Sequence, residues 1–162
     1  ETTVAETRWE DWPKLEALYA LTGHWQLKSH HFQQFGHACF ESAYPALRRD
    51  MESGSIICTR VMRTETGAVV GHAMLGPDLG WRSRALALDF MVHPGFVPQA
   101  HELLDAIALP NGSKVHAYCD ERATDKAELL EGMGFEREAT LSKLIEDENH
   151  VLMDVLVYGN TA

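Results

Sequence analysis

The chain has 162 residues, 45% of them hydrophobic, which is enough for one hydrophobic core and predicts a single domain over residues 1–162. Its formal net charge is −10, and this excess of acidic residues argues against DNA, RNA or anionic lipid as partners, because clustered Lys and Arg bind those surfaces. The sequence has no apolar run of membrane-spanning length, and the opening ETTVAETRWE lacks the layout of a secretion signal. We therefore expect a cytoplasmic protein.

The first elements predicted along the chain are a strand and a helix. Residues 2–10, TTVAETRWE, contain β-branched residues with some alternation, which favours a strand. The following DWPKLEALYALTG predicts a helix, with Asp11 as its cap and Pro13 in its first turn. Residues 24–53 are predicted to form one or two short helices separated near Pro45.

Strands are predicted for the middle of the chain. Residues 55–76 contain two apolar, β-branched runs joined by RTETG, a pattern typical of a hairpin with Gly67 in the turn. Residues 85–92, ALALDFMV, form an almost unbroken apolar run, which indicates a strand covered on both faces.

The second half alternates helices and strands. QAHELLDAIAL predicts a helix with one apolar face, formed by Ala100, Leu103, Leu104 and Ile107. A strand KVHAYCD, a helix ATDKAELLEGMGF capped by Thr124, and a strand pair over 136–159 follow. This order predicts an α/β (α+β) fold, with a mixed, mostly antiparallel central sheet of six to seven strands and helices on both faces.

The order and several motifs resemble the GNAT superfamily of acyl-CoA-dependent N-acetyltransferases over nearly the whole chain. GAVVGHAML is similar to the family's G-x-x-V-G hairpin strand, FMVHP to its central strand ending in V-x-P, and LLEGMGFERE to the end of its last helix and the strand after it. The resemblance implies a GNAT-like fold that transfers an acetyl group from acetyl-CoA to an amine of a small molecule or a peptide.

The resemblance also implies where coenzyme would bind. In the family the central strand offers backbone groups to the pantetheine arm, and a glycine-rich loop wraps the pyrophosphate. The corresponding positions here are Met91, Val92, Gln99, Ala100 and His101. The stretch GFVPQAHE lacks both expected glycines, Pro98 has no amide to donate, and Glu102 adds negative charge. The sequence therefore predicts a degenerate pyrophosphate loop that binds acetyl-CoA weakly.

Acetyl transfer also needs groups that move protons. The family's general-acid Tyr falls at Leu130 of this chain, and its Asn falls at Ala123. Candidates for the general base are Asp89, His72 and His116. Asp89 interrupts an apolar strand, where burial could raise the pKa of its carboxyl group, and a structural hydrogen-bonded carboxylate is the alternative. His72 and His116 lie in predicted strands, where packed histidines are the alternative.

Two features of residues 24–37 bear on the site. Four histidines, His24, His30, His31 and His37, fall within 14 residues, but their spacing matches no zinc motif, so we predict no metal site. Trp25 and Phe32 lie where the family places its acceptor-binding helices.

The sequence leaves three interpretations of function open. One is an N-acetyltransferase. Another is a non-catalytic GNAT-like domain that binds a ligand or a protein, including the silent half of a homodimer or of a tandem pair with a second GNAT domain. The third, outside the family, is a small α/β domain that binds a different ligand in the cleft beside the central strand.

Overall fold

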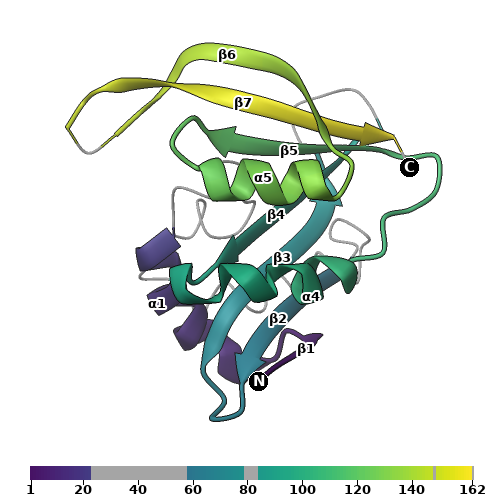
Figure 1. Ribbon diagram of the computed structural model, residues 1–162, viewed down its shortest axis with the longest axis vertical. Helices are drawn as coiled ribbons and strands as arrows, with labels where there is room; N and C mark the ends of the chain where they lie inside the picture. The colour runs from purple at the N-terminus through teal and green to yellow at the C-terminus, as the bar shows by residue number, and fades with distance from the viewer. Residues whose placement is uncertain (23–57, 79–83, 148, 162) are drawn as a thin grey trace.

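A computed structural model describes residues 1–22, 58–78, 84–147 and 149–161. Within this part of the chain, seven strands form one sheet in the order β1-β2-β3-β4-β5-β7-β6 (Figure 1). Their bounds are β1 (Thr2–Glu6), β2 (Cys58–Thr64), β3 (Val69–Pro77), β4 (Leu86–Val92), β5 (Lys114–Asp120), β6 (Glu136–Glu146) and β7 (Leu152–Thr161). The pair β4–β5 is parallel and the other neighbours are antiparallel, which confirms the predicted mixed, mostly antiparallel sheet.

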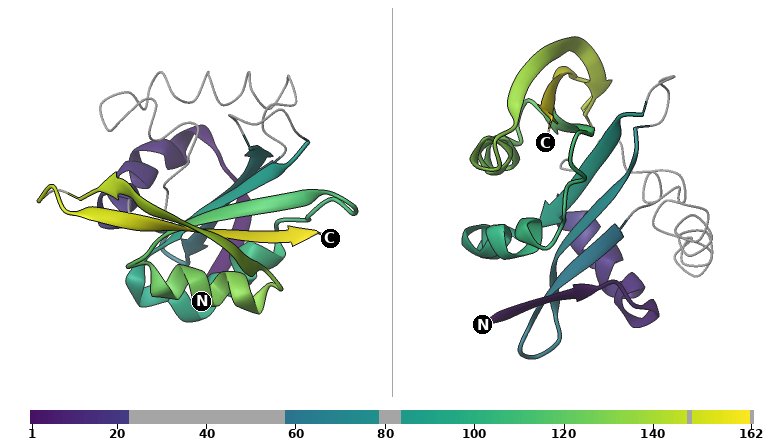
Figure 2. Two further views of the ribbon diagram at one scale, coloured as in Figure 1. Left: turned by 90° about the horizontal axis from the view of Figure 1, so that it is seen from above. Right: turned by 90° about the vertical axis from the view of Figure 1, so that its right-hand side faces the viewer.

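Helices cover both faces of the sheet. The described α-helices are α1 (Trp12–Thr22), α4 (Ala100–Asp105) and α5 (Thr124–Gly132), and two 3₁₀ helices are η1 (Trp9–Asp11) and η3 (Pro94–Gln99). Helices α4 and α5 lie on one face and α1 lies on the other (Figure 2). The predicted two-sided arrangement is therefore confirmed. No helix of the described segments is long and apolar enough to cross a bilayer.

The β2–β3 hairpin forms as the sequence predicts. Gly67 has φ +84°, a left-handed conformation that glycine adopts without a steric penalty, and its amide donates to the Thr64 carbonyl at 2.9 Å. Next to the turn, the Arg63 side chain forms a buried ion pair with Asp11, and Arg63 Nε lies 3.0 Å from Asp11 Oδ1. This pair joins β2 to the residue directly before α1.

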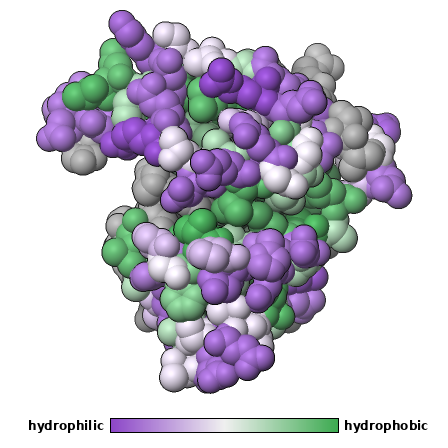
Figure 3. Space-filling view, viewed as in Figure 1, coloured by the Kyte–Doolittle hydropathy of each residue, from purple (hydrophilic) through white to green (hydrophobic). Residues whose placement is uncertain are grey.

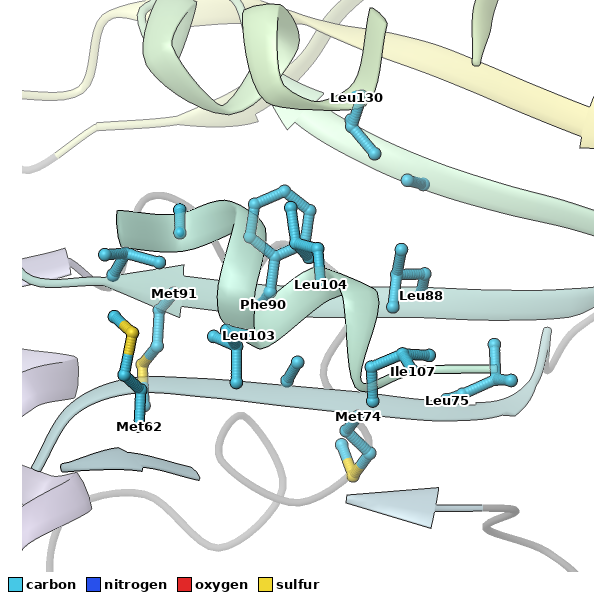
Figure 4. Close-up of a cluster of buried hydrophobic side chains, with 14 of the residues drawn as sticks. Met62, Met74, Leu75, Leu88, Phe90, Met91, Leu103, Leu104, Ile107 and Leu130 are labelled. Carbon is cyan, nitrogen blue, oxygen red and sulfur yellow. The ribbon is translucent and has the colours of Figure 1, made fainter. Parts of the chain in front are cut away.

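The predicted apolar face of α4 forms the centre of the core. Ala100, Leu103, Leu104 and Ile107 are all buried. Figure 4 shows the last three of these side chains in one cluster with Phe90 and Leu88 of β4 and Leu75 of β3. Close packing between α4 and the sheet leaves little room at Gly71, because a Cβ atom there would lie 3.1 Å from Leu103 Cδ2 and the Leu103 side chain would have to move slightly.

Three local predictions were wrong in detail. The turn that precedes α4 is itself the 3₁₀ helix Pro94–Gln99, with prolines at its first and fifth positions, and α4 ends at Asp105 instead of continuing to residue 109. Thr124 does not cap α5 because Ala123 occupies the N-cap position. A tight turn, in which the Ala123 amide donates to the Asp120 carbonyl at 2.9 Å, places Thr124 inside the helix. The helices predicted within residues 24–53 lie outside the described residues.

Candidate active site

The candidate site lies where the parallel strands β4 and β5 separate. The paired residues are Leu86 with Val115 and Ala87 with His116, and farther along the two strands diverge (Figure 1). We call the wedge between residues 88–92 of β4 and residues 117–120 of β5 the splay. Figure 3 shows a band of hydrophobic residues between the hydrophilic surfaces over α4 and α5 on this side of the molecule.

One wall of the splay carries main-chain groups of β4. The His93 amide donates to Val70 O of β3 at 2.8 Å. Because the main-chain groups of an extended strand alternate in direction, those of Val92, Phe90 and Leu88 face β5 instead. A ligand chain that lies along β4 can therefore hydrogen-bond this wall. Of the two predicted coenzyme contacts on the strand, this alternation favours Val92, because the main-chain groups of Met91 face β3.

A buried carboxylate orients a histidine at the narrow end of the splay. Asp78 Oδ2 lies 2.7 Å from His116 Nδ1 and accepts a hydrogen bond of 2.6 Å from the Tyr118 hydroxyl. The Asp78 side chain is 0% exposed, whereas that of His116 is 22% exposed. An ionised carboxylate can only accept hydrogen bonds, so in the neutral form of His116 the proton is on Nδ1 and Nε2 is the acceptor. This is the arrangement that prepares an imidazole to remove a proton from another group.

Asp89 shares its face of β4 with Ala87, the residue paired with His116. Across the sheet its partner is Met74, which points away from α4 (Figure 4). The sheet therefore brings the predicted residues Asp89 and His116 to one face near the start of the splay. Asp89 is 2% exposed, so it is buried among its neighbours.

Lys126 of α5 brings its amino group to the splay. The residue is fully buried, and its Nζ donates to the Tyr118 carbonyl at 2.7 Å and lies 5.5 Å from the Phe90 ring centroid. Burial lowers the pKa of the Lys126 ammonium group, whereas the charges of Asp89 and Cys119 act in the opposite direction. Burial also raises the pKa of the Cys119 thiol.

His72 lies in a separate buried network. Its ring is 0% exposed, and Nε2 is 2.8 Å from Thr59 Oγ1, which in turn is 2.8 Å from Thr7 Oγ1. These contacts join β3 to β2 and to the residue after β1. The protein encloses this imidazole on every side, in contrast to the partly exposed ring of His116.

Several main-chain amides of the turn between β4 and α4 already donate hydrogen bonds within the turn. The Gly95 amide donates to His93 Nδ1 at 3.0 Å, the Phe96 amide donates to the His93 carbonyl at 2.8 Å, and the Ala100 amide donates to the Val97 carbonyl. Pro94 and Pro98 have no amide hydrogen. Five backbone positions of this short turn therefore offer no uncommitted donor to a phosphate group.

The other predicted coenzyme contacts surround the start of α4. Ala100 is fully buried, whereas His101 is exposed, with its Nδ1 3.0 Å from the Pro98 carbonyl. Gln99 is the partly buried last residue of the 3₁₀ helix. Glu102 accepts a hydrogen bond of 2.7 Å from the Thr2 hydroxyl, so its carboxylate connects α4 to β1.

Sequence reasoning missed three polar residues of the site: Asp78, Tyr118 and Lys126. The sequence does indicate that Lys126 faces the core, because it lies one helical turn before the apolar Leu130, on the same face of the predicted amphipathic helix. Asp78 directly follows β3, and pairing across the sheet brings it to β5. The histidines between 24 and 37, Trp25 and Phe32 lie outside the described residues. Among the residues described, no cluster of three or more His, Cys, Asp or Glu could hold a metal ion.

No family model and no curated protein matches the sequence, whereas solved structures match it over almost its full length. An N-acetyltransferase from Staphylococcus aureus Mu50 is 14% identical, with a TM-score of 0.75 and coverage of 99% of this chain and 98% of that chain. A ribosomal-protein-alanine N-acetyltransferase from Brucella melitensis is 17% identical, with a TM-score of 0.72 and 99% coverage of both chains.

A GNAT superfamily phosphinothricin acetyltransferase from Sinorhizobium meliloti, solved in complex with AcCoA, is 14% identical, with a TM-score of 0.70 and coverage of 98% of this chain and 87% of that chain. These structures define the architecture as that of the GNAT acetyltransferases. The predicted GNAT-like fold is therefore confirmed. At this level of identity the likeness shows the fold alone.

Proposed function

We propose that the protein transfers an acetyl group from acetyl-CoA to an amine of a small molecule or a peptide, with His116 as the general base. The observation that carries this proposal is the Asp78–His116 pair at the narrow end of the splay. The pair supplies a partly exposed imidazole, and the contact with Asp78 favours the neutral tautomer that accepts a proton at Nε2. An amine must lose a proton as it is acylated, and a base positioned for this typically contributes about 10²–10⁴-fold in rate.

The splay offers main-chain hydrogen-bonding groups to the arm of the coenzyme. Main-chain groups of Val92, Phe90 and Leu88 face it, and these can hydrogen-bond the amides of a pantetheine chain that lies along β4. Such a chain, entering at the open end near Val92, has its terminus near the closed end, beside Ala87 and His116. The solved relative in complex with AcCoA supports the same class of ligand.

Each residue of the pair has a distinct role in this mechanism. Acetyl-CoA supplies the activated acetyl group. Asp78 fixes the His116 ring by accepting from Nδ1, and Tyr118 holds the same carboxylate oxygen in place. His116 Nε2 then accepts the proton from the amine nitrogen as that nitrogen bonds to the acetyl carbon, and the resulting imidazolium is stabilised by the adjacent carboxylate.

Asp89 is the competing candidate for the base. It lies on the same face as His116, but it is almost fully buried and it is a source of the negative charge that favours the ammonium form of Lys126. If Asp89 were the base, Asp89→Asn would abolish transfer and His116→Gln would leave it largely intact. We expect the larger loss in His116→Gln, by a factor of about 10²–10⁴ in kcat.

The experiment measures CoA release from acetyl-CoA against a panel of amines and amino-terminal peptides. Wild type, His116→Gln and Asp89→Asn are compared, and His150→Gln is the matched control because this exposed histidine lies in the β6–β7 turn. Circular dichroism and thermal unfolding verify that each variant is folded. No acetyl transfer by the wild type to any acceptor would refute the proposed activity.

A second candidate function is a non-catalytic GNAT-like domain that binds a ligand or a protein. Its support is the turn before α4, where the prolines and the engaged amides leave few donors for a pyrophosphate. Leu130 supports it too, because it is an apolar, fully buried side chain at the position of the family's general acid. Calorimetric titration separates the two candidates. Absence of binding at millimolar acetyl-CoA favours the non-catalytic domain, whereas micromolar binding with turnover favours the transferase and contradicts the degenerate loop.

If the pyrophosphate site is weak, the protein should depend little on the nucleotide part of its acetyl donor. If the pantetheine arm supplies most of the binding energy, S-acetylpantetheine should approach acetyl-CoA in kcat/KM, to within about tenfold, because only the lost phosphate contacts separate the two donors. A loss of about 10³-fold or more would instead place a functional phosphate site in this protein.

A further inference from the structure

Lys126 is the one buried lysine of the described residues, and its position needs a physical reason. Moving an ammonium group out of water is costly unless charges and hydrogen bonds compensate for its lost hydration. A hydrophobic side chain would fill the same volume without that cost. Lysines are therefore rarely retained at fully buried positions without a role for the charge or the proton.

The Lys126 ammonium group lies between the two walls of the splay. It contacts β4 through the Phe90 ring, 5.5 Å away, and β5 through the Tyr118 carbonyl, 2.7 Å away. The Glu121 amide donates to Asp154 O of β7, so the alternation along β5 turns the Tyr118 carbonyl toward β4. The hydrogen bond to the Tyr118 carbonyl thus places Nζ at the β5 wall of the wedge that the proposed donor would enter, with the Phe90 ring of β4 close by.

In the proposed reaction, acetyl transfer releases a thiolate into this wedge. A thiolate in a site of low polarity is strongly disfavoured unless it receives a proton or a neighbouring positive charge. His116 cannot serve this need during the same step, because it is accepting the amine proton. Leu130, one turn after Lys126 on α5, has no proton to give.

Resting on the transferase activity proposed above, we propose that Lys126 is the catalytic acid that delivers a proton to the departing thiolate sulfur. As the amine nitrogen bonds to the acetyl carbon, the C–S bond breaks and its electron pair goes to sulfur. The Lys126 ammonium loses one proton to that sulfur, which gives CoA thiol and a neutral lysine. His116 gains one proton from the amine, and exchange with solvent returns both side chains to their starting forms.

The surroundings of Lys126 suit this role. Asp89 on β4 favours the charged form, and Cys119 on β5 acts in the same direction. Burial has the largest effect and lowers the pKa of the ammonium group, which makes it a stronger acid than an exposed lysine. A purely structural role, in which Lys126 only ties α5 to β5 through the Tyr118 carbonyl, is the alternative that the experiment must separate.

The experiment varies the leaving thiol. Lys126→Met keeps the length of the side chain and removes its proton, and Lys114→Met is the matched control at a half-exposed lysine of β5 that pairs with Glu138 on the surface. Each variant and the wild type are assayed with acetyl-CoA, an alkyl thioester, and with S-acetyl-4-nitrothiophenol, whose thiolate is far less basic and leaves without a proton.

We expect Lys126→Met to lower transfer from acetyl-CoA by about 10²–10⁴-fold and transfer from the aryl thioester by less than about tenfold, with Lys114→Met close to wild type for both donors. Equal losses for the two donors, or no loss, would overturn the role of Lys126 while leaving the transferase function intact. A wild type inactive with both donors would refute the transferase function itself, and the acid with it.

A second measurement uses the wild type alone and does not depend on the folding of a variant. Across acetyl thioesters whose thiols differ in acidity, a proton donor makes the rate of transfer only weakly dependent on the basicity of the leaving thiolate. A steep dependence would overturn the proposal.

Discussion

Asp78→Asn tests the link between the buried carboxylate and the chemistry of His116. In the structure, one Asp78 oxygen faces both His116 Nδ1, at 2.7 Å, and the Tyr118 hydroxyl, at 2.6 Å, and the side chain is fully buried. Asparagine has nearly the same shape but removes the negative charge and replaces one acceptor by donors. We expect unfolding free energy to fall by about 1.5–3 kcal/mol, the usual contribution of a hydrogen bond to a charged group.

The expected loss of activity is larger than the loss of stability would suggest. Without the carboxylate, the His116 ring is no longer held in the tautomer with a proton on Nδ1, and the imidazolium formed during transfer loses its counter-charge. We expect kcat to fall by about 10²–10⁴-fold. Urea unfolding gives the change in stability, and CoA release at saturating amine gives kcat.

Tyr118→Phe is the matched control for this prediction. It removes the other hydrogen bond to the same oxygen while leaving the Asp78–His116 pair in place. Unfolding free energy should fall by about 0.5–1.5 kcal/mol, with a much smaller loss of kcat than in Asp78→Asn. If both variants lost the same fraction of activity, the carboxylate would be a structural group and the reasoning about the tautomer would be refuted.

Three further outcomes test the fold around the site. Gly71→Ala should lower the unfolding free energy, measured by urea titration, by about 1–3 kcal/mol, because the added Cβ atom would lie 3.1 Å from Leu103. An unchanged free energy would contradict the close packing of α4 on β3. Arg63→Met removes the cation that pairs with the buried Asp11 carboxylate and leaves it, among the described residues, only the Arg8 amide as a donor, which should cost about 3–5 kcal/mol in the same assay. A change below about 1 kcal/mol would mean that the pair is effectively solvated. Cys119 should resist iodoacetamide in the native protein and react after unfolding, because the thiol is fully buried and burial raises its pKa. Labelling is measured by peptide mass spectrometry, and rapid labelling of the native protein would refute this prediction.

Elements with strong local patterns were predictable from the sequence. The apolar run 85–92, the hairpin around Gly67 and the face of α4 defined by Leu103 and Leu104 all have the period or the turn chemistry of the structure they form. Helix ends were less predictable. The start of α5 depends on the turn after β5, where the Asp120 side chain binds Arg122, and no local propensity of Thr124 competes with that turn.

The candidate site was predictable only in part, because most of its contacts join residues distant in the chain. The sequence singles out His116 as one of several histidines, but its partner Asp78 is 38 residues away and is brought close by the order of the strands. Lys126 has the same property, since only the separation of β4 from β5 places it beside Phe90. A list of polar residues on predicted strands therefore names candidates, and the topology of the sheet selects among them.

The short parallel junction between β4 and β5 is also the place where the sheet is held together by the fewest paired residues. Strands β1 to β4 and strands β5, β7 and β6 form two continuous ladders, and the pairs Leu86–Val115 and Ala87–His116 join them directly. Amide hydrogens at this junction should exchange with deuterium sooner than those inside either ladder, because opening it breaks few main-chain hydrogen bonds, in addition to the side-chain contacts of Asp78 and Lys126. A ligand that bound between the two ladders would slow this exchange. The rate of deuterium uptake at residues 86–92 therefore reports whether a ligand is bound in the splay.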